Sequence, residues 1–145
     1  MRPKDRASQV AALPLTVGND DQIYVLLVTS RETKRWVIPK GWPSRKMTDS
    51  KAASREADEE AGVTGTIEST PIGSYRYRKV LPENTRIISV DVYPLWVRKQ
   101  RKNWQEKGER VRVWATLDEA AKLVREPGLK RLFAGLSAGN LMKRR

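Results

Sequence analysis

Two reactive side chains are absent from this sequence of 145 residues, which has no cysteine and no histidine. Without cysteine there is no disulfide framework and no thiolate nucleophile. Without histidine the chain lacks the commonest zinc ligand and the commonest general base. Any bound metal must therefore take oxygen ligands, which suit Mg²⁺, Mn²⁺ or Ca²⁺. Acid–base chemistry falls to carboxylates or to the metal itself.

Long hydrophobic runs are also missing. No stretch approaches the roughly 18 apolar residues that a membrane span needs, and the first residues do not resemble a secretory signal. We therefore expect a cytoplasmic protein. The length fits a single domain spanning 1–145, in which residues 1–8 and 138–145 are expected to be loose basic tails.

Negative charge is scarce relative to positive charge. Lysine and arginine total 29 against 17 aspartate and glutamate residues, a formal net charge of +12. Such a field attracts polyanions and speeds their arrival. It fits nucleic acid, a membrane surface or a phosphorylated small molecule as the partner, and by itself it does not choose among them.

Strand patterns alternate with helical patterns along the chain. Strands are expected at 10–17, 23–29, 36–38, 67–77, 86–97 and 111–114. Helices are expected at 49–61, at 116–124 behind a Thr116–Glu119 capping box, and from Pro127 to about Leu136. Thr48 or Asp49 can cap the start of the first helix, and Gly62 stands where a helix-ending glycine belongs. Residues 40–44 and 99–110 are expected to be loops. The order predicts an α+β, or mixed α/β, domain.

Four of the acidic residues fall within positions 56–60, which is unusual in so basic a chain. On a helix, Glu56, Glu59 and Glu60 span roughly 100° and share one face, whereas Asp58 points elsewhere. Carboxylates gathered on one face repel unless a cation neutralises them, and Mg²⁺ accepts such ligands. Arg55 can brace a neighbouring carboxylate. The competing interpretation is an ordinary solvated acidic helix.

Residues 41–63 resemble the signature of the Nudix hydrolases, G-x5-E-x7-R-E-U-x-E-E-x-G-U, where U is a bulky aliphatic residue. Gly41 begins the match, Arg55-Glu56 and Glu59-Glu60 fall at the required offsets, and Gly62-Val63 completes it. Two positions depart from the pattern. Met47 stands where the family usually has a glutamate that supports the metal site, and Ala57 stands where a larger aliphatic residue is common.

The resemblance implies a mixed β-sheet between helices, with the motif forming a loop–helix–loop. It implies that Glu56, Glu59 and Glu60 hold the metal, that Arg55, Glu59 and Glu60 are catalytic, and that water attacks the substrate. The base that activates this water varies within the family. Glu60, Glu106 and Glu109 are the candidates here, the last two from the charged loop.

Residues 35–42, Trp104 and residues 110–114 resemble the branch that includes diphosphoinositol polyphosphate phosphohydrolases and diadenosine polyphosphate hydrolases. Both implied substrates are densely anionic and suit arginine and lysine contacts. The predicted substrate-binding residues are Arg31, Lys34, Arg35, Lys40, Gly41, Trp42, Arg76 and Arg78. Trp42 can stack on a purine or cover the core, and burial is the favoured role.

Alternation along 75–78 places the two tyrosines on one strand face and the two arginines on the other. Three other functions fit parts of the sequence. One is a nucleotide-directed Nudix pyrophosphatase acting on nucleoside triphosphates or RNA ends. Another is a catalytically inactive Nudix domain that only binds its ligand, for which Met47 is the hint. The last is a basic nucleic-acid-binding module, which leaves the glutamate cluster unexplained.

Overall fold

One mixed sheet organises the chain, and the computed structural model describes residues 6–145 of it. Its strands are β1 (Arg6–Val17), β2 (Ile23–Thr29), β3 (Trp36–Val37), β4 (Lys40–Gly41), β5 (Val63–Ile67), β6 (Gly73–Val80), β7 (Thr85–Gln100) and β8 (Arg112–Thr116). The helices are α1 (Asp49–Ala61), α2 (Leu117–Leu123), α3 (Pro127–Gly135) and α4 (Ala138–Arg144).

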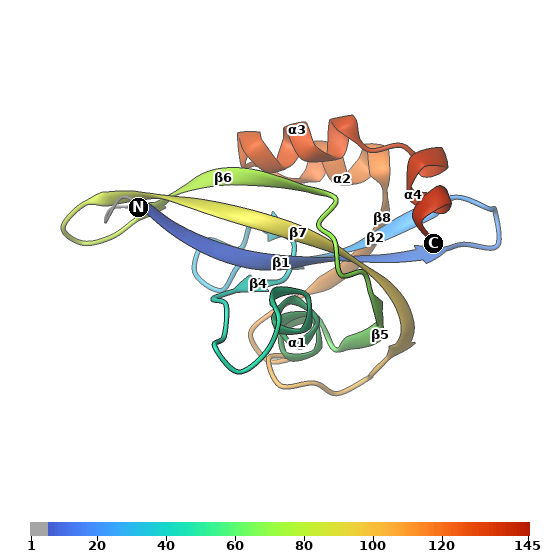
Figure 1. Cartoon of the computed structure of the whole chain (residues 1–145), viewed down its shortest axis with the longest axis horizontal. Helices are drawn as coiled ribbons and strands as arrows, with labels where there is room; N and C mark the ends of the chain where they lie inside the picture. The colour runs from blue at the N-terminus through green and yellow to red at the C-terminus, as the bar shows by residue number, and fades with distance from the viewer. Residues whose placement is uncertain (1–5) are drawn as a thin grey trace.

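The sheet has the strand order β3-β2-β1-β7-β5, with β4 paired to β1, β6 to β7 and β8 to β2. Long strands β1 and β7 run parallel at its centre, and the other pairs are antiparallel. Helix α1 lies against one face, while α2 and α3 cover the other (Figure 1). This arrangement confirms the expected mixed sheet between helices.

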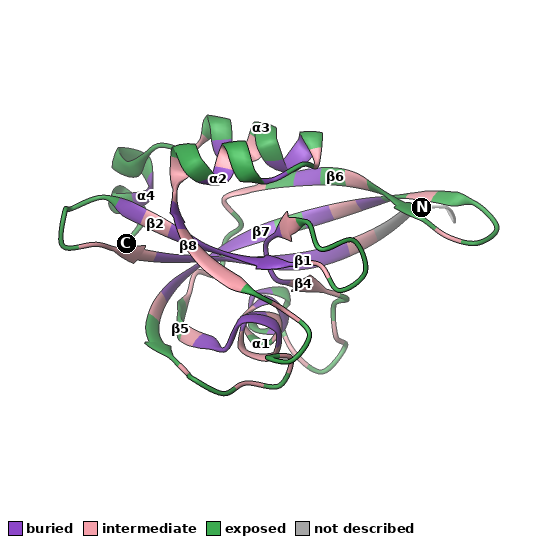
Figure 2. Ribbon diagram, turned by 180° about the vertical axis from the view of Figure 1, so that it is seen from behind, coloured by how far each residue is buried: buried purple, intermediate pink, exposed green. Residues whose placement is uncertain are grey.

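Side chains along β1 alternate between the two faces of the sheet, and a hydrophobic core lies on each face. Leu13 and Leu15 pack with Leu129 and Phe133 of α3, and all four are almost fully buried. Alternate positions on the other face pack under α1, whose alanines Ala52, Ala53, Ala57 and Ala61 are inaccessible to solvent. The burial colours follow this pattern, with buried segments along β1 and β7 (Figure 2). Ala57 therefore serves close packing of the helix on the sheet.

The C-terminal tail was predicted to be loose, and this was wrong for residues 138–145. Residues 138–144 form α4, which buries Leu141 completely, and Ser137 caps its first turn. The Arg144 Nε donates to Glu68 Oε1 at 2.9 Å. At the other end, residues 6–8 begin β1, and residues 1–5 of the expected loose arm lie outside the described residues.

Two boundaries inside the sheet also differ from the prediction. Lys40 and Gly41, expected to be loop, form β4 and pair with Ala11 and Val10 of β1. The expected strand at 67–77 is two strands, because β5 ends at Ile67 and β6 begins at Gly73. No helix in the described part of the chain is long and apolar enough to cross a membrane.

Candidate active site

Helix α1 carries the glutamate cluster and is fixed at both ends by its own sequence. The Thr48 side chain accepts the backbone N–H of Lys51, which caps the first turn. Gly62 ends the helix in the left-handed conformation, at φ 68°, and its N–H returns to the carbonyls of Ala57 and Asp58. A residue with a side chain is strained at this φ, so the predicted C-terminal glycine is explained.

A cleft of about 330 Å³ opens beside α1 and is the candidate active site. Three carboxylates line it: Glu56 and Glu60 from α1, and Glu106 from the loop between β7 and β8. Its remaining walls include four cationic side chains, Arg31, Lys40, Lys79 and Arg110. The cleft thus brings three carboxylates and four cationic side chains together.

Gly41 lets the backbone of β4 approach the Glu56 carboxyl group. A Cβ added at Gly41 would lie only 2.3 Å from Glu56 Cδ, a separation that real Cβ atoms do not show. The glycine at the start of the 41–63 match therefore leaves room for the Glu56 carboxyl group, which a Cβ would displace.

Glu60 is the most buried acidic group of the cleft, with 6% of its surface exposed. Burial, together with the charge of Glu56, raises its pKa to about 8, against the opposing effects of Arg110 and Lys40. Burial likewise raises the pKa of Glu56. Both shifts mean that two neighbouring carboxylates are held where ionisation is costly without a cation.

A family model described as NUDIX domain matches residues 6–136. The chain belongs to the NUDIX domain family. Nudix hydrolase 16, mitochondrial, of Arabidopsis thaliana is 32% identical over 122 residues, which cover 78% of this chain and 66% of that protein. The alignments span between 50% and 66% of the length of three curated relatives.

Solved structures share the fold at low sequence identity. A C. elegans Ap4A hydrolase binary complex superposes with a TM-score of 0.67 and 18% identity, covering 95% of this chain and 98% of that chain. The NUDIX domain of Shewanella oneidensis NrtR, complexed with ADP ribose, superposes with a TM-score of 0.67 and 16% identity, covering 95% and 88%. These likenesses support the Nudix fold.

Within this Nudix domain, Glu59 lies apart from the other two predicted metal ligands. It forms an ion pair with Arg55, with Arg55 Nε 3.8 Å from Glu59 Oε2, and it does not line the cleft. Among the described residues, no group of three acidic side chains converges closely enough to hold a metal ion. Asp58 was predicted to point away from the other carboxylates, and this is confirmed. It forms an ion pair with Arg101 and does not line the cleft.

Arg110 is a central residue of the cleft that the sequence did not single out for a catalytic role. Its side chain is 9% exposed, donates to Glu106 Oε1 at 2.6 Å and to the Thr29 carbonyl at 3.0 Å, and lies 3.7 Å from Glu60 Oε2. The contact with Glu60 spans 50 sequence positions, so only the folded structure could connect the two groups.

The two glutamates of the late loop have different positions. Glu106 faces the cleft, and its backbone N–H donates to the Glu59 carbonyl at 3.1 Å. Glu109 is an exposed partner of Arg31, with the two charged groups 3.9 Å apart. Of the two candidate bases in this loop, Glu106 lines the cleft and Glu109 does not.

Met47 packs inward at the start of α1. It is half-buried against the cluster that contains Ala52, Ala53 and Ala57. Met47 directly precedes the N-cap Thr48, and an apolar residue in this position that packs beside the first turn fixes the entry of the chain into the helix. The methionine thus has a packing role in this chain.

The predicted substrate contacts divide between two cavities. Arg31, Lys40, Gly41 and Trp42 line the cleft. Arg35, Arg76 and Arg78 line a second cavity of about 380 Å³. Lys34 lines neither, and its Nζ donates to the Glu109 carbonyl at 3.4 Å. The prediction that Trp42 is buried in the core was wrong, because 48% of its surface is exposed at the cleft.

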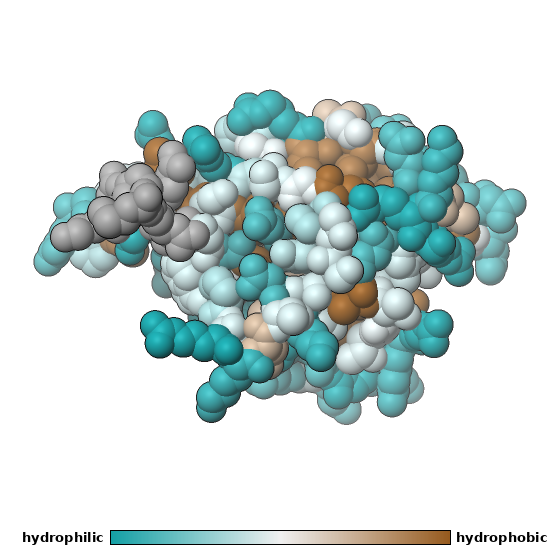
Figure 3. Space-filling view, viewed as in Figure 1, coloured by the Kyte–Doolittle hydropathy of each residue, from teal (hydrophilic) through white to brown (hydrophobic). Residues whose placement is uncertain are grey.

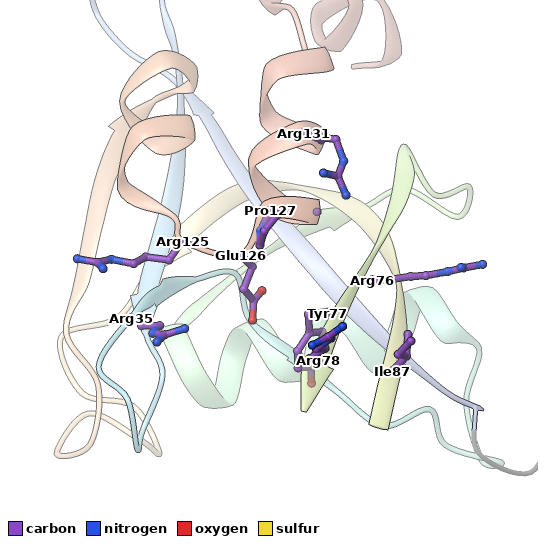
Figure 4. Close-up of a pocket in the computed structure, with 10 residues that line it drawn as sticks. Arg35, Arg76, Tyr77, Arg78, Ile87, Arg125, Glu126, Pro127 and Arg131 are labelled. Atoms are coloured by element: carbon purple, nitrogen blue, oxygen red, sulfur yellow. The ribbon is translucent and has the colours of Figure 1, made fainter. Parts of the chain in front are cut away.

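The second cavity lies between β6, the start of α3 and the residue before β3 (Figure 4). Alternation on β6 is confirmed, since Tyr75 is buried and Arg76 and Arg78 are exposed. Tyr77 lines both cavities, and its hydroxyl donates to Gln9 Oε1 at 2.7 Å. The two cavities are therefore neighbours that share one wall.

Lys40 stands at this shared wall. Its Nζ lies 4.9 Å from the centre of the Tyr77 ring. Burial lowers its pKa, against the opposing attraction of Glu126 and Glu60. The Lys40 ammonium group is therefore attracted both by Glu60 of the cleft and by Glu126 of the second cavity.

Proposed function

We propose that this Nudix domain hydrolyses a phosphoanhydride bond in a highly phosphorylated diphosphate substrate, with the help of Mg²⁺ or Mn²⁺. The observation that carries the proposal is the pair of neighbouring carboxylates, buried Glu60 and half-buried Glu56, in a cleft that four cationic side chains also line. A solvated acidic helix would leave these groups in water, whereas here burial raises both pKa values.

The donor set fits a hard divalent cation. Glu56 and Glu60 offer oxygen ligands only, and Mg²⁺ is commonly bound by one or two carboxylates together with water and substrate phosphates. Glu59 would join them after leaving its ion pair with Arg55. A cation held there neutralises charge on phosphate oxygens and makes water a better nucleophile.

The residues around the carboxylates have distinct roles in the proposal. Arg110 orients Glu60 and Glu106 through its fixed contacts to both. Lys40 meets the phosphate chain. Glu106 takes the proton of the attacking water in this proposal, and its support is that it is the late-loop carboxylate that lines the cleft. Arg31 and Lys79 add positive charge at the cleft for further phosphates.

Diphosphoinositol polyphosphates and diadenosine polyphosphates are the favoured substrates. Both would match the positive charge that lines the two cavities. Two structural neighbours, an Ap4A hydrolase and a domain complexed with ADP ribose, support a ligand with linked phosphates. The alternatives, nucleoside triphosphates, RNA ends or ligand binding without catalysis, become outcomes of the experiment.

The test measures phosphate release from a substrate panel with Mg²⁺ and with a chelator. The panel holds diadenosine polyphosphates, diphosphoinositol phosphates, nucleoside triphosphates, RNA with a 5′-triphosphate end, sugar nucleotides and NADH. We expect Mg²⁺-dependent hydrolysis that falls about a hundredfold or more in Glu60→Gln, as loss of a metal ligand predicts. Glu83→Gln, at an exposed hairpin position, is the matched control. Full activity in Glu60→Gln, or a preference for sugar nucleotides or NADH, would contradict the proposal.

A further inference from the structure

The two central strands of the sheet separate before either of them ends. The parallel pairing of β1 with β7 stops at Leu15 and Trp96, although β1 continues to Val17 and β7 to Gln100. Past this point β7 turns away with its partner β5, and β1 stays beside β2 (Figure 1). The described chain places no other strand between them, so the two facing edges have no ladder partner. Unpaired backbone groups at the edge of a sheet can form a concave site for an anion.

A pocket of about 240 Å³ lies where the two strands separate, and we call it the fork pocket. Strands β1, β5 and β7 line it together with Arg145, the residue after α4. No acidic side chain of residues 6–145 lines it, whereas the cleft and the second cavity each have at least one. Gln9 of β1 lines the cleft, and Leu15 of the same strand lines the fork pocket. The interval between these two residues spans about 20 Å of strand, so the two sites are separate.

Two arginines from distant parts of the chain meet at the fork pocket. Arg98 of β7 forms no ion pair or side-chain hydrogen bond within residues 6–145. The Arg145 Cζ lies 5.5 Å from the centre of the Trp96 ring, and such stacking orients a guanidinium plane. Trp96 is itself fixed, since its indole N–H donates to Glu68 Oε2 at 3.0 Å. Glu68 is thus occupied by Trp96 and Arg144, and it pairs with neither arginine of the pocket.

Hydroxyl and apolar groups complete the lining of the fork pocket. Thr16 of β1 and Thr66 of β5 line it, and neither hydroxyl forms a hydrogen bond within residues 6–145. Leu15, Val17 and Trp96 supply apolar surface. Arginine binds oxyanions through parallel N–H donors, and a phosphate group carries more than one negative charge. Two unpaired guanidinium groups with hydroxyl donors beside them therefore match a phosphate group better than a singly charged carboxylate.

We infer that the fork pocket binds a phosphate group, carried by inorganic phosphate or by a small phosphate monoester. Arg98 and Arg145 contact the phosphate oxygens, and the hydroxyls of Thr16 and Thr66 donate hydrogen bonds to them. The apolar wall beside Trp96 leaves a place for the organic part of a monoester. The inference concerns a second site, and it holds whether or not the cleft hydrolyses a phosphoanhydride.

The experiment follows the indole N–H signals of the ¹⁵N-labelled protein by NMR, with a chelator present and the ionic strength held constant. Trp96→Phe assigns the signal of the fork pocket, and Trp42→Phe assigns a signal that reports the cleft. Titration with inorganic phosphate should shift the Trp96 signal to saturation. Arg98→Met should raise the Kd read from Trp96 roughly tenfold, as loss of a hydrogen bond between charged groups predicts. The same variant should leave the Trp42 titration unchanged.

Lys99→Met is the matched control, because it removes the same charge from the next residue of β7, which does not line the fork pocket. It should change the Kd by less than about twofold, as for an exposed charge. Arg145→Lys keeps the charge but loses the planar guanidinium group, and it should weaken binding several-fold. Equal effects of Arg98→Met and Lys99→Met would show attraction by net charge alone, and a Trp96 signal that never saturates would show no site. Either result overturns the inference.

Two further titrants identify the chemical class of the ligand. Acetate at matched ionic strength should shift the Trp96 signal little, and acetate that binds as tightly as phosphate would contradict a phosphate site. Phenyl phosphate is compared with inorganic phosphate to distinguish the two sources of the phosphate group. If phenyl phosphate binds more tightly, the ligand is a monoester whose organic part meets the apolar wall. If it binds no more tightly, the ligand is free phosphate, and both results support the site.

Discussion

At the scale of single residues, Glu60 combines burial with a neighbouring like charge. It is 6% exposed beside Glu56, and Arg110 and Lys40 only partly compensate. Such a group is a poor contributor to folding and a good one to metal binding, because a cation removes both the repulsion and part of the desolvation cost. Under the proposed function, this is a trade of stability in the metal-free protein for affinity toward the metal.

This trade predicts the pH dependence of the metal-free protein. In the folded protein the pKa of Glu60 is raised from 4.5 to about 8, so the folded state holds a proton that the unfolded state has released. The stability contribution of this group is thus complete below about pH 4.5 and is lost as the pH rises toward about 8. With a chelator present, we expect Tm to fall over this range more steeply in wild type than in Glu60→Gln. Parallel curves would contradict the buried, protonated Glu60.

Gly41 gives a second prediction at the residue scale. Gly41→Ala places a Cβ where the Glu56 carboxyl group lies, and the flexible side chain is expected to move rather than the backbone. We expect a near-normal Tm but a loss of roughly tenfold or more in kcat/KM, since displacing a ligand by about 1 Å is costly. Gly108→Ala is the control, because a Cβ there meets nothing within 4 Å. Equal activity of the two variants would show that Glu56 needs no fixed position.

The residues of the site were predictable where one helix carries them, and not where the fold joins distant segments. Glu56, Glu60 and Gly41 lie in one spaced motif. Arg110 and Glu126 reach the site from positions 50 or more residues away from the groups they approach. Neither has a local pattern that distinguishes it from the many other charged surface residues of this chain.

At the scale of elements, the loop between β7 and β8 fixes the C-terminal end of α1. The Trp104 indole N–H donates to the Glu60 carbonyl at 3.0 Å. Arg112 stacks on Trp104 at 3.8 Å and donates to the carbonyls of Ala61 and Arg101. The helix end that presents Glu60 is therefore held by Trp104 of this loop and by Arg112 at the start of β8.

Arg112→Met tests this role of the loop. The variant keeps much of the apolar contact but removes two hydrogen bonds, so we expect a loss of about 1–3 kcal/mol in the free energy of unfolding. Because α1 then loses its fixed end, kcat should fall as well. Arg45→Met, at an exposed loop position, should remain within about 0.5 kcal/mol of wild type. Denaturant unfolding of both variants gives the comparison, and equal stabilities would contradict the clamp.

Helix boundaries with strong caps were predictable, whereas short elements stabilised by tertiary contacts were not. Thr48, Gly62 and the Thr116–Glu119 box carry local signals and were confirmed. Helix α4 has only seven residues and depends on burial of Leu141 and the Arg144–Glu68 pair. Strand β4 has two residues and exists through its pairing with β1. Such elements depend on contacts that a local pattern does not contain.

At the scale of the whole molecule, positive charge covers a surface that is mostly hydrophilic. On the face shown in Figure 3, hydrophilic residues dominate and hydrophobic ones gather in a patch beside α3. The formal net charge is +12, while acidic groups are among the residues that line both cavities. The global field thus attracts polyanions that the local carboxylates alone would repel.

Because the attraction of a polyanionic substrate comes from the net charge of the whole molecule, the reaction should depend on ionic strength. For a polyphosphorylated substrate, kcat/KM should fall by roughly an order of magnitude between about 0.05 M and about 0.5 M salt, because salt screens long-range attraction. The effect should appear mainly in KM.

Lys79→Gln removes a cleft charge and should lower kcat/KM several-fold at low salt, with a smaller difference at high salt. Lys143→Gln, on the exposed side of α4, removes equal charge away from the cleft and should change kcat/KM less. If the two variants behave alike, only net charge matters, and if salt has no effect, the substrate is not the polyanion proposed.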